Sequence, residues 1–363
     1  MIIEGKRVLL NNRKKYKVII CNTNDTIVKF IDYIKKFNQK NNLNKFISLD
    51  FEFNRSLDNT KREIALFQIC FEASDDNPYI YMFYPPDLNN DQIDILKELL
   101  LNTSIKKIIH GGESLDIPYL FTDLLKTNKE YQNFCINLFD TKYLCEYYNL
   151  DNNLSENKCK IYYLLKQMKI IDNKQFDYLI DNEKKMGSIS EIRIDVTNMS
   201  EELIKYSAYD VLYLVNLYNS FPKNTMYQCL IPEITSVHFI FKQTDFFKNF
   251  SEKIAEYNNY FTYYNSNNKK LITYFNEIYS KIEAQYINLF KILYFKKFYV
   301  LIIKYITYNI IISKVQVYKK KDIPVNGELY TVHDIIKNFI NFKFLVTFIE
   351  KILFLIKQNL IIV

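Results

Sequence analysis

The sequence predicts an α/β protein, with a mixed β-sheet flanked by helices in residues 1–222 and a mainly helical region in residues 223–363. Short apolar stretches with the alternation of strands come first, and later ones are interleaved with stretches of helical periodicity. Pro222 follows the last strongly periodic helix, and the sequence beyond it is aromatic and rich in lysine. We therefore place a domain boundary at residue 222.

The elements of the first region can be expected in order along the chain. Strands are expected at residues 17–21, 46–54, 64–72, 79–84, 105–112 and 135–141. Helices are expected at residues 23–37, 91–101, 142–149, 161–168 and 200–218, with a further helix through Leu120 and Leu125. Ser200 is the expected cap of the last helix, and two glutamates occupy its first turn, where the helix dipole favours them.

Composition limits the class of protein. The chain has 363 residues, of which 48% are hydrophobic and 25% charged, so it can form two globular domains. Its six cysteines include no C-x-x-C pair, which argues against a zinc ribbon and favours a reduced, intracellular compartment. The N-terminal residues contain no apolar stretch long enough for a secretory signal. We expect a cytoplasmic or nuclear protein that is not secreted.

Charge is unevenly distributed. Residues 251–363 contain 16 lysines and 8 acids, whereas residues 1–250 carry a net charge of −1. The lysines, densest at residues 314–322, predict either a platform for nucleic-acid phosphates or an ordinary solvated helix face. The apolar stretch at residues 298–313 is interrupted by Lys304 and is shorter than the ~20 residues of a membrane-spanning helix. No stable membrane insertion is expected.

The strand at residues 46–54, FISLDFEFN, carries two acids where an apolar strand should have none. Asp50 and Glu52 point to the same face of this strand, about 7 Å apart. Two such carboxylates repel each other and resist burial unless a positive charge lies between them. The pair is therefore either a solvated strand face or part of a site for a divalent metal ion.

Two further acids lie in comparable positions. Tyr206 and Asp210 are separated by one helical turn and share a face of the expected helix at residues 200–218. Asp116 follows a strand and a glycine turn. A single Tyr/Asp pair of this kind is more often a hydrogen-bonded core feature than a catalytic one, so only the whole set of acids indicates a function.

Together these pieces resemble the 3′–5′ exonuclease superfamily with four catalytic carboxylates, and within it the ribonuclease D group and the Werner-type exonuclease domains. The resemblance covers roughly residues 16–222, including the family-like segments 66–69 and 139–141. Its three blocks are Asp50 with Glu52, then His110, Gly111, Asp116 and Leu120, and finally Tyr206 with Asp210.

The resemblance implies a ribonuclease H-like fold and a metal-dependent 3′–5′ exonuclease that acts on single-stranded nucleic acid, with RNA slightly favoured. It implies that two divalent cations, Mg²⁺ or Mn²⁺, are held by four carboxylates, and that Tyr206 orients the attacking water. Two such cations ~4 Å apart can activate water and stabilise the leaving 3′ oxygen. The four implied ligands are Asp50, Glu52, Asp116 and Asp210.

Two departures from the family pattern leave alternatives open. Asp116 lies six residues after His110, where the family commonly has five, so Glu113 is the alternative ligand; the helix-like continuation after Asp116 favours Asp116. The chain also lacks tryptophan, and residues 193–198 are its nearest equivalent of the family segment before the last helix. The alternative function is a catalytically silent scaffold that keeps the fold and binds nucleic acid or protein. The presence of all four acids favours the enzyme.

Overall fold

The computed structural model describes residues 2–40, 44–56, 58, 60–73, 77–154, 158–224, 226–242, 322–325 and 328–331. The chain forms two compact units, Met1–Phe239 and Ile240–Val363. Most of the second unit, including residues 298–313 and 314–321, lies outside the described residues. Its described strands, β8 (Asp322–Val325) and β9 (Glu328–Thr331), form an antiparallel hairpin that the sequence did not predict. No helix in the described ranges is long and apolar enough to cross a membrane.

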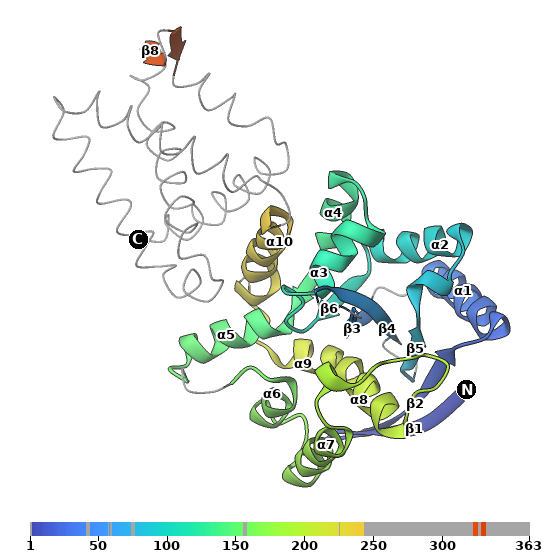
Figure 1. Ribbon diagram of the computed structural model, residues 1–363. Coiled ribbons are helices and arrows are strands. Elements are labelled where there is room, and N and C mark those ends of the chain that lie inside the picture. The colour runs from blue at the N-terminus through green and yellow to red at the C-terminus, as the bar shows by residue number, and fades with distance from the viewer. Residues whose placement is uncertain are drawn as a thin grey trace. The chain divides into compact units, whose positions relative to one another are not determined.

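The first unit is built on a seven-stranded mixed sheet, as predicted (Figure 1). The strand order is β1-β2-β5-β4-β3-β6-β7, with β3 antiparallel to β4 and parallel to β6. The strands are β1 (Ile2–Val8), β2 (Arg13–Cys21), β3 (Lys45–Arg55), β4 (Arg62–Ala73), β5 (Tyr79–Phe83), β6 (Lys106–Ile109) and β7 (Leu138–Asp140).

Helices cover both faces of this sheet (Figure 1). On β4, Phe71 packs against Phe30 of α1, and the next residue, Glu72, binds Arg7, which also contacts the end of α8. Adjacent residues of a strand point to opposite faces, so α1 and α8 lie on opposite sides of β4. The helices are α1 (Asn24–Gln39), α2 (Asn90–Leu101), α3 (Asp116–Tyr119), α4 (Asn128–Cys135), α5 (Thr141–Asp151), α6 (Ile161–Gln167), α7 (Asn173–Met186), α8 (Glu201–Leu212), α9 (Leu214–Ser220) and α10 (Ile231–Lys242).

Several elements differ from the sequence-based expectation. The helix expected at residues 200–218 is two helices, α8 and α9, which are divided at Tyr213. The strand expected at residues 135–141 is only Leu138–Asp140, because a capping box at Thr127 starts α4 and Asn137, with a φ of 58°, turns the chain into the strand. Strand β1 and helix α7 were not predicted.

The N-terminal hairpin is fixed to the sheet by a buried ion pair. Arg7 is 1% exposed, and its guanidinium donates to both carboxylate oxygens of Glu72 at 2.8 Å. The same side chain donates to the Leu212 carbonyl oxygen at 3.0 Å. Since a buried charge needs its partner, this contact ties β1, β4 and the end of α8 together.

The first compact unit extends beyond residue 222. Ser236 Oγ of α10 donates to the Cys135 carbonyl oxygen at 3.2 Å, and the rings of Tyr143 and Phe239 lie 6.0 Å apart. These contacts attach the beginning of the predicted C-terminal region to the first unit. The assignment of residues 1–222 and 223–363 to separate domains stays a prediction.

Candidate active site

Strand β3 directs its two acids toward helix α8. Asp50 is paired with Gln68 across the antiparallel ladder, and Gln68 shares a face of β4 with Glu72. Because Glu72 and Arg7 contact the α8 side of the sheet, Asp50 faces that side as well. Glu52 lies on the same face, immediately before a shift in the β3–β4 register. Such bulges often lie beside active sites, where they redirect a side chain.

Helix α8 supplies the third acid. Ser200 caps this helix by accepting a hydrogen bond from the Leu203 backbone N–H, so the helix starts where the sequence predicted. Asp210 then lies in the last turns of α8, facing the sheet. One carboxylate oxygen each from Asp50, Glu52 and Asp210 lies within 4.8 Å of the others. The structure therefore brings three of the four predicted ligands together.

Asp116 is placed by the glycine turn after β6. Gly111 has a φ of +75°, a conformation that favours glycine. A Cβ on Gly112 would lie 2.9 Å from Ile109 Cδ1 and 3.4 Å from Asp116 Oδ2. Both glycine N–H groups donate to the Asp140 carboxylate, at 2.9 and 3.2 Å. The turn therefore needs two small residues and an acid on β7 to present Asp116 at the start of α3.

Asp116 is not one of the three acids within 4.8 Å, but it belongs to the same electrostatic cluster. Burial and then the charge of Asp50 raise the pKa of Asp116, and Asp116 in turn contributes to the raised pKa of Glu52. Glu113, the alternative ligand, accepts a 2.6 Å hydrogen bond from Tyr143. Asp116 therefore remains the predicted fourth ligand.

The four acids are held in a site that disfavours their charged forms. Burial raises the pKa of Asp50 to about 7. Burial and mutual repulsion also raise the pKa values of Glu52, Asp116 and Asp210 well above the usual range. No lysine or arginine among the described residues forms an ion pair with any of the four. An all-carboxylate oxygen donor set of this kind suits hard divalent cations such as Mg²⁺ and Mn²⁺.

Tyr206 lies beside these carboxylates, as its position one turn before Asp210 predicted. The side chain is half-buried, and the nearby charge of Asp210, followed by burial, raises the pKa of its phenol. The phenol in turn offsets a part of the rise in the pKa of Asp210. Tyr206 therefore keeps its proton at neutral pH and can act only as a neutral hydrogen-bonding group.

Two residues at this site were missed by sequence reasoning. Asp140 was part of a family-like segment, and its position just before a helix, where it caps α5 by accepting from the Lys142 N–H at 2.9 Å, could have identified it. Tyr162 of α6 donates to Asp210 Oδ1 at 3.2 Å. No sequence pattern connects Tyr162 with Asp210, because the two side chains meet only through the tertiary fold.

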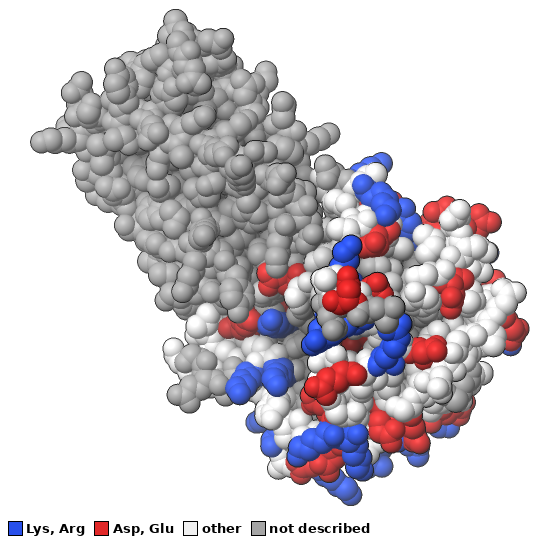
Figure 2. All heavy atoms as spheres, in the orientation of Figure 1, with Lys and Arg blue, Asp and Glu red and all other residues white. Residues whose placement is uncertain are grey.

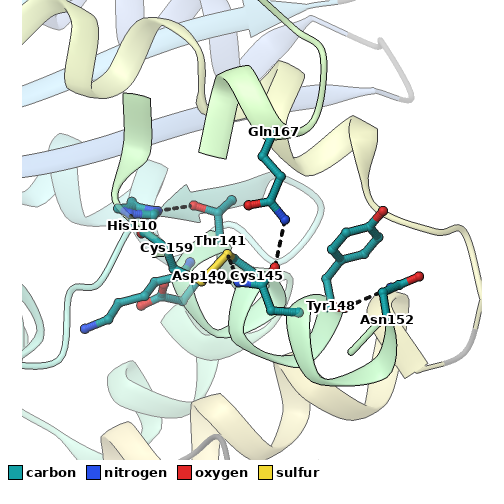
Figure 3. Close-up of a disulfide and its surroundings, with 10 residues drawn as sticks. His110, Asp140, Thr141, Cys145, Tyr148, Asn152, Cys159 and Gln167 are labelled. Carbon is teal, nitrogen blue, oxygen red and sulfur yellow. Dashed lines mark hydrogen bonds between the residues drawn. A yellow bond between two sulfur atoms is a disulfide. The ribbon is translucent and has the colours of Figure 1, made fainter. Parts of the chain in front are cut away.

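His110 is a structural residue in this site. Its Nε2 donates to the Cys159 carbonyl oxygen at 2.9 Å, and its Nδ1 lies 2.8 Å from the Thr141 hydroxyl (Figure 3). Burial lowers the pKa of the imidazole to about 4, so the ring is neutral. Cys145 and Cys159 form a disulfide, which the sequence analysis did not predict. The sequence spacing of these cysteines carried no disulfide signal.

The visible face of the first unit shows no single sign of charge. Figure 2 shows lysines and arginines mixed with aspartates and glutamates over the visible face of the described residues. This mixture agrees with the net charge of −1 for residues 1–250. The basic excess of the chain belongs to residues 251–363, most of which lie outside the described ranges.

Solved structures and one curated sequence are similar to this chain. Ribonuclease D from Trypanosoma brucei in complex with GMP shares 18% identity with a TM-score of 0.44, over 63% of this chain and 64% of that one. NrnC from Brucella melitensis bound to pGG shares 18% identity with a TM-score of 0.35, over 56% and 87%. The uncharacterized protein L533 of Acanthamoeba polyphaga mimivirus is 30% identical over 340 residues.

The L533 match covers 84% of this chain but spans only 66% of the length of that relative. The family model described as 3′–5′ exonuclease matches residues 18–225, which include all three blocks of predicted site residues. The chain therefore belongs to the 3′–5′ exonuclease family, and the predicted resemblance is confirmed.

Proposed function

We propose that this protein is a metal-dependent 3′–5′ exonuclease that removes nucleotides from the 3′ end of single-stranded nucleic acid, with RNA favoured over DNA. The observation that carries the proposal is the convergence of Asp50, Glu52 and Asp210 within 4.8 Å in a chain of this family. The preference for RNA is taken from the family resemblance alone. The alternative, a catalytically silent binding scaffold, would not need to keep these acids together.

The carboxylates fit the cations that the family implies. Holding four buried or half-buried acids together without a basic partner is unfavourable, and bound divalent cations would offset their repulsion. Asp50, Glu52, Asp116 and Asp210 would hold two of them, Mg²⁺ or Mn²⁺. When bound, these cations supply the positive charge that acidifies a water molecule and stabilises the charge that develops on the phosphate and the leaving oxygen.

The chain's own residues would orient the reactants. The charge of Asp210 and burial keep the Tyr206 hydroxyl protonated, so this group can hydrogen-bond the attacking water but cannot remove its proton. The Asp140–glycine contacts hold the turn from which Asp116 projects. The mostly buried β3 strand fixes the positions of Asp50 and Glu52.

The first experiment tests the reaction and its direction. Single-stranded RNA and DNA of one sequence, labelled at the 5′ end, are incubated with Mg²⁺ or Mn²⁺, and shortening is followed on sequencing gels. We expect stepwise shortening from the 3′ end, none in EDTA and none of a circular single strand. Asp210→Asn should be inactive, whereas Asp177→Asn, an exposed acid on α7, should match wild type. Binding without shortening would support the scaffold, and an active Asp210→Asn would contradict the site.

Tyr206→Phe tests the neutral tyrosine. This variant keeps the ring and removes only the hydroxyl, so we expect single-turnover rates to fall by roughly 10²-fold or more, as when one positioned catalytic group is lost. Substrate affinity should change little. Tyr163→Phe is the matched control, because Tyr163 is exposed. A Tyr206→Phe rate within a few-fold of wild type would make Tyr206 a packing residue.

The pH dependence of stability tests the repulsion among the acids. A carboxylate with a raised pKa in the folded state contributes stability below the unfolded pKa, near ~4, and loses it as pH rises through the folded pKa. For Asp50 that upper limit is about 7. In metal-free buffer at pH 8, Asp50→Asn should therefore melt above wild type, by roughly a few degrees.

At pH 5 the difference between Asp50→Asn and wild type should shrink, because Asp50 is then protonated. His110, whose pKa is lowered, also makes stability depend on pH, but it is present in both proteins and its effect cancels in the comparison. The melting temperature of Asp177→Asn should match that of wild type at both pH values. Differential scanning calorimetry with EDTA measures these values. A melting temperature of Asp50→Asn below that of wild type at pH 8 would show that Asp50 is stabilised by its surroundings.

A further inference from the structure

We propose that Tyr162 positions the Asp210 carboxylate, and that the Cys145–Cys159 disulfide holds Tyr162 in place, so that the redox state of this cysteine pair regulates the site. This inference rests on the proposed function, because it concerns the same metal-binding carboxylates. Tyr162 and the two cysteines lie outside the three sequence blocks that carry the family resemblance.

Tyr162 makes a direct contact with one predicted ligand. Its hydroxyl donates to Asp210 Oδ1 at 3.2 Å, and its side chain is buried, with 4% of the residue exposed. A donor fixed by packing limits the rotation of the carboxylate that accepts from it. Groups of this kind, behind the residues that touch a metal ion, commonly set the orientation of those residues and their affinity for the ion.

The helix that carries Tyr162 depends on tertiary anchors. Helix α6 has only seven residues, and Lys160 at its N-cap makes no side-chain capping hydrogen bond. Isolated helices of this length are unstable in water. The position of Tyr162, in the first turn of α6, must therefore be set by contacts with the rest of the fold.

Both ends of α6 are attached to α5. At its C-terminal end, Gln167 Nε2 donates to Asn149 Oδ1 at 2.7 Å. Just before its N-terminal end, Cys159 is bonded to Cys145 of α5, and the Cys159 carbonyl oxygen accepts from His110 (Figure 3). The disulfide is the covalent anchor of the end of α6 that carries Tyr162.

The disulfide can react with a reductant. Cys145 is buried, but Cys159 is half-buried and so can be approached by a small thiol. A dithiol would attack Cys159 Sγ as a thiolate, break the S–S bond and release Cys145 as a thiolate that takes up a proton. The second sulfur of the dithiol would then displace Cys159, which also becomes a thiol. Two electrons and two protons pass to the cysteines, and the dithiol becomes a disulfide.

Reduction removes the covalent link between α5 and the start of α6. The hydrogen bonds from His110 to the Cys159 carbonyl oxygen and from Asn149 Nδ2 to Cys159 Sγ then hold the start of the helix without a covalent bond, while Gln167 still holds its far end. We expect Tyr162 to lose its fixed position, so that Asp210 binds a cation more weakly. Reoxidation should restore the contact.

The role of Tyr162 is tested by metal binding rather than by activity. Mn²⁺ affinity of the full chain is measured by the electron paramagnetic resonance signal of free Mn²⁺. Tyr162→Phe should bind Mn²⁺ about 10-fold more weakly than wild type, the lower end of the effect of groups behind metal ligands. The neighbouring Tyr163→Phe should bind like wild type, because Tyr163 is exposed. Equal affinities of Tyr162→Phe and wild type would overturn the positioning role.

The role of the disulfide is tested by the same measurement of Mn²⁺ affinity. Wild type is measured oxidised, then after treatment with dithiothreitol and anaerobic desalting, and then after reoxidation. Reduction should weaken Mn²⁺ binding several-fold and reoxidation should restore it. The double variant Cys145→Ser/Cys159→Ser should bind weakly whatever the treatment, and Cys229→Ser, at an exposed free cysteine, should respond like wild type. Circular dichroism confirms that each sample is folded.

The outcomes separate this inference from the proposed function. If oxidised and reduced wild type bind Mn²⁺ equally, the regulatory role of the disulfide is wrong even if the enzyme is active. This comparison uses wild-type protein only, so it does not depend on the folding of any variant. If wild type binds Mn²⁺ and responds to reduction but shortens no nucleic acid, the exonuclease function alone is wrong. If wild type binds no Mn²⁺, both are overturned.

Discussion

Repulsion among buried and half-buried carboxylates is the constraint on which this structure depends. Asp50, Glu52 and Asp210 are held within 4.8 Å, and the fourth acid, Asp116, adds to the same field. No described basic residue pairs with them, so the fold itself must hold these groups together against their charge. The free energy for this must come from packing elsewhere, and the mostly buried strand β3 and the buried residues of α8 supply such packing here.

The surrounding elements can be understood as supports for that cluster. The pairing of β3 with β4 sets which face Asp50 and Glu52 occupy. The glycine turn, held by Asp140, sets the approach of Asp116. Acids from three different parts of the chain therefore lie on one side of the sheet. Hydrogen bonds and the register of strand pairing align them, and ion pairs do not.

The sequence was informative where local patterns report the structure directly. The alternation around Asp50 identified the strand and the shared face of its acids, and the one-turn spacing of Tyr206 and Asp210 identified their common face. The sequence was uninformative where distant segments meet. The contact of Tyr162 with Asp210 and the Cys145–Cys159 disulfide both depend on how α5 and α6 pack, which no spacing reports. Helix α7 was missed although Asp172 caps it, because no strong apolar stripe follows that cap.

The central claim is that these four acids form a binding site for divalent cations. The most direct measurement is anomalous diffraction near the manganese absorption edge from crystals equilibrated with Mn²⁺. We expect anomalous peaks among Asp50, Glu52, Asp116 and Asp210, and their loss in Asp210→Asn crystals. Carboxyl groups hydrogen-bonded to one another with no anomalous peak between them, in Mn²⁺-saturated wild-type crystals, would contradict it.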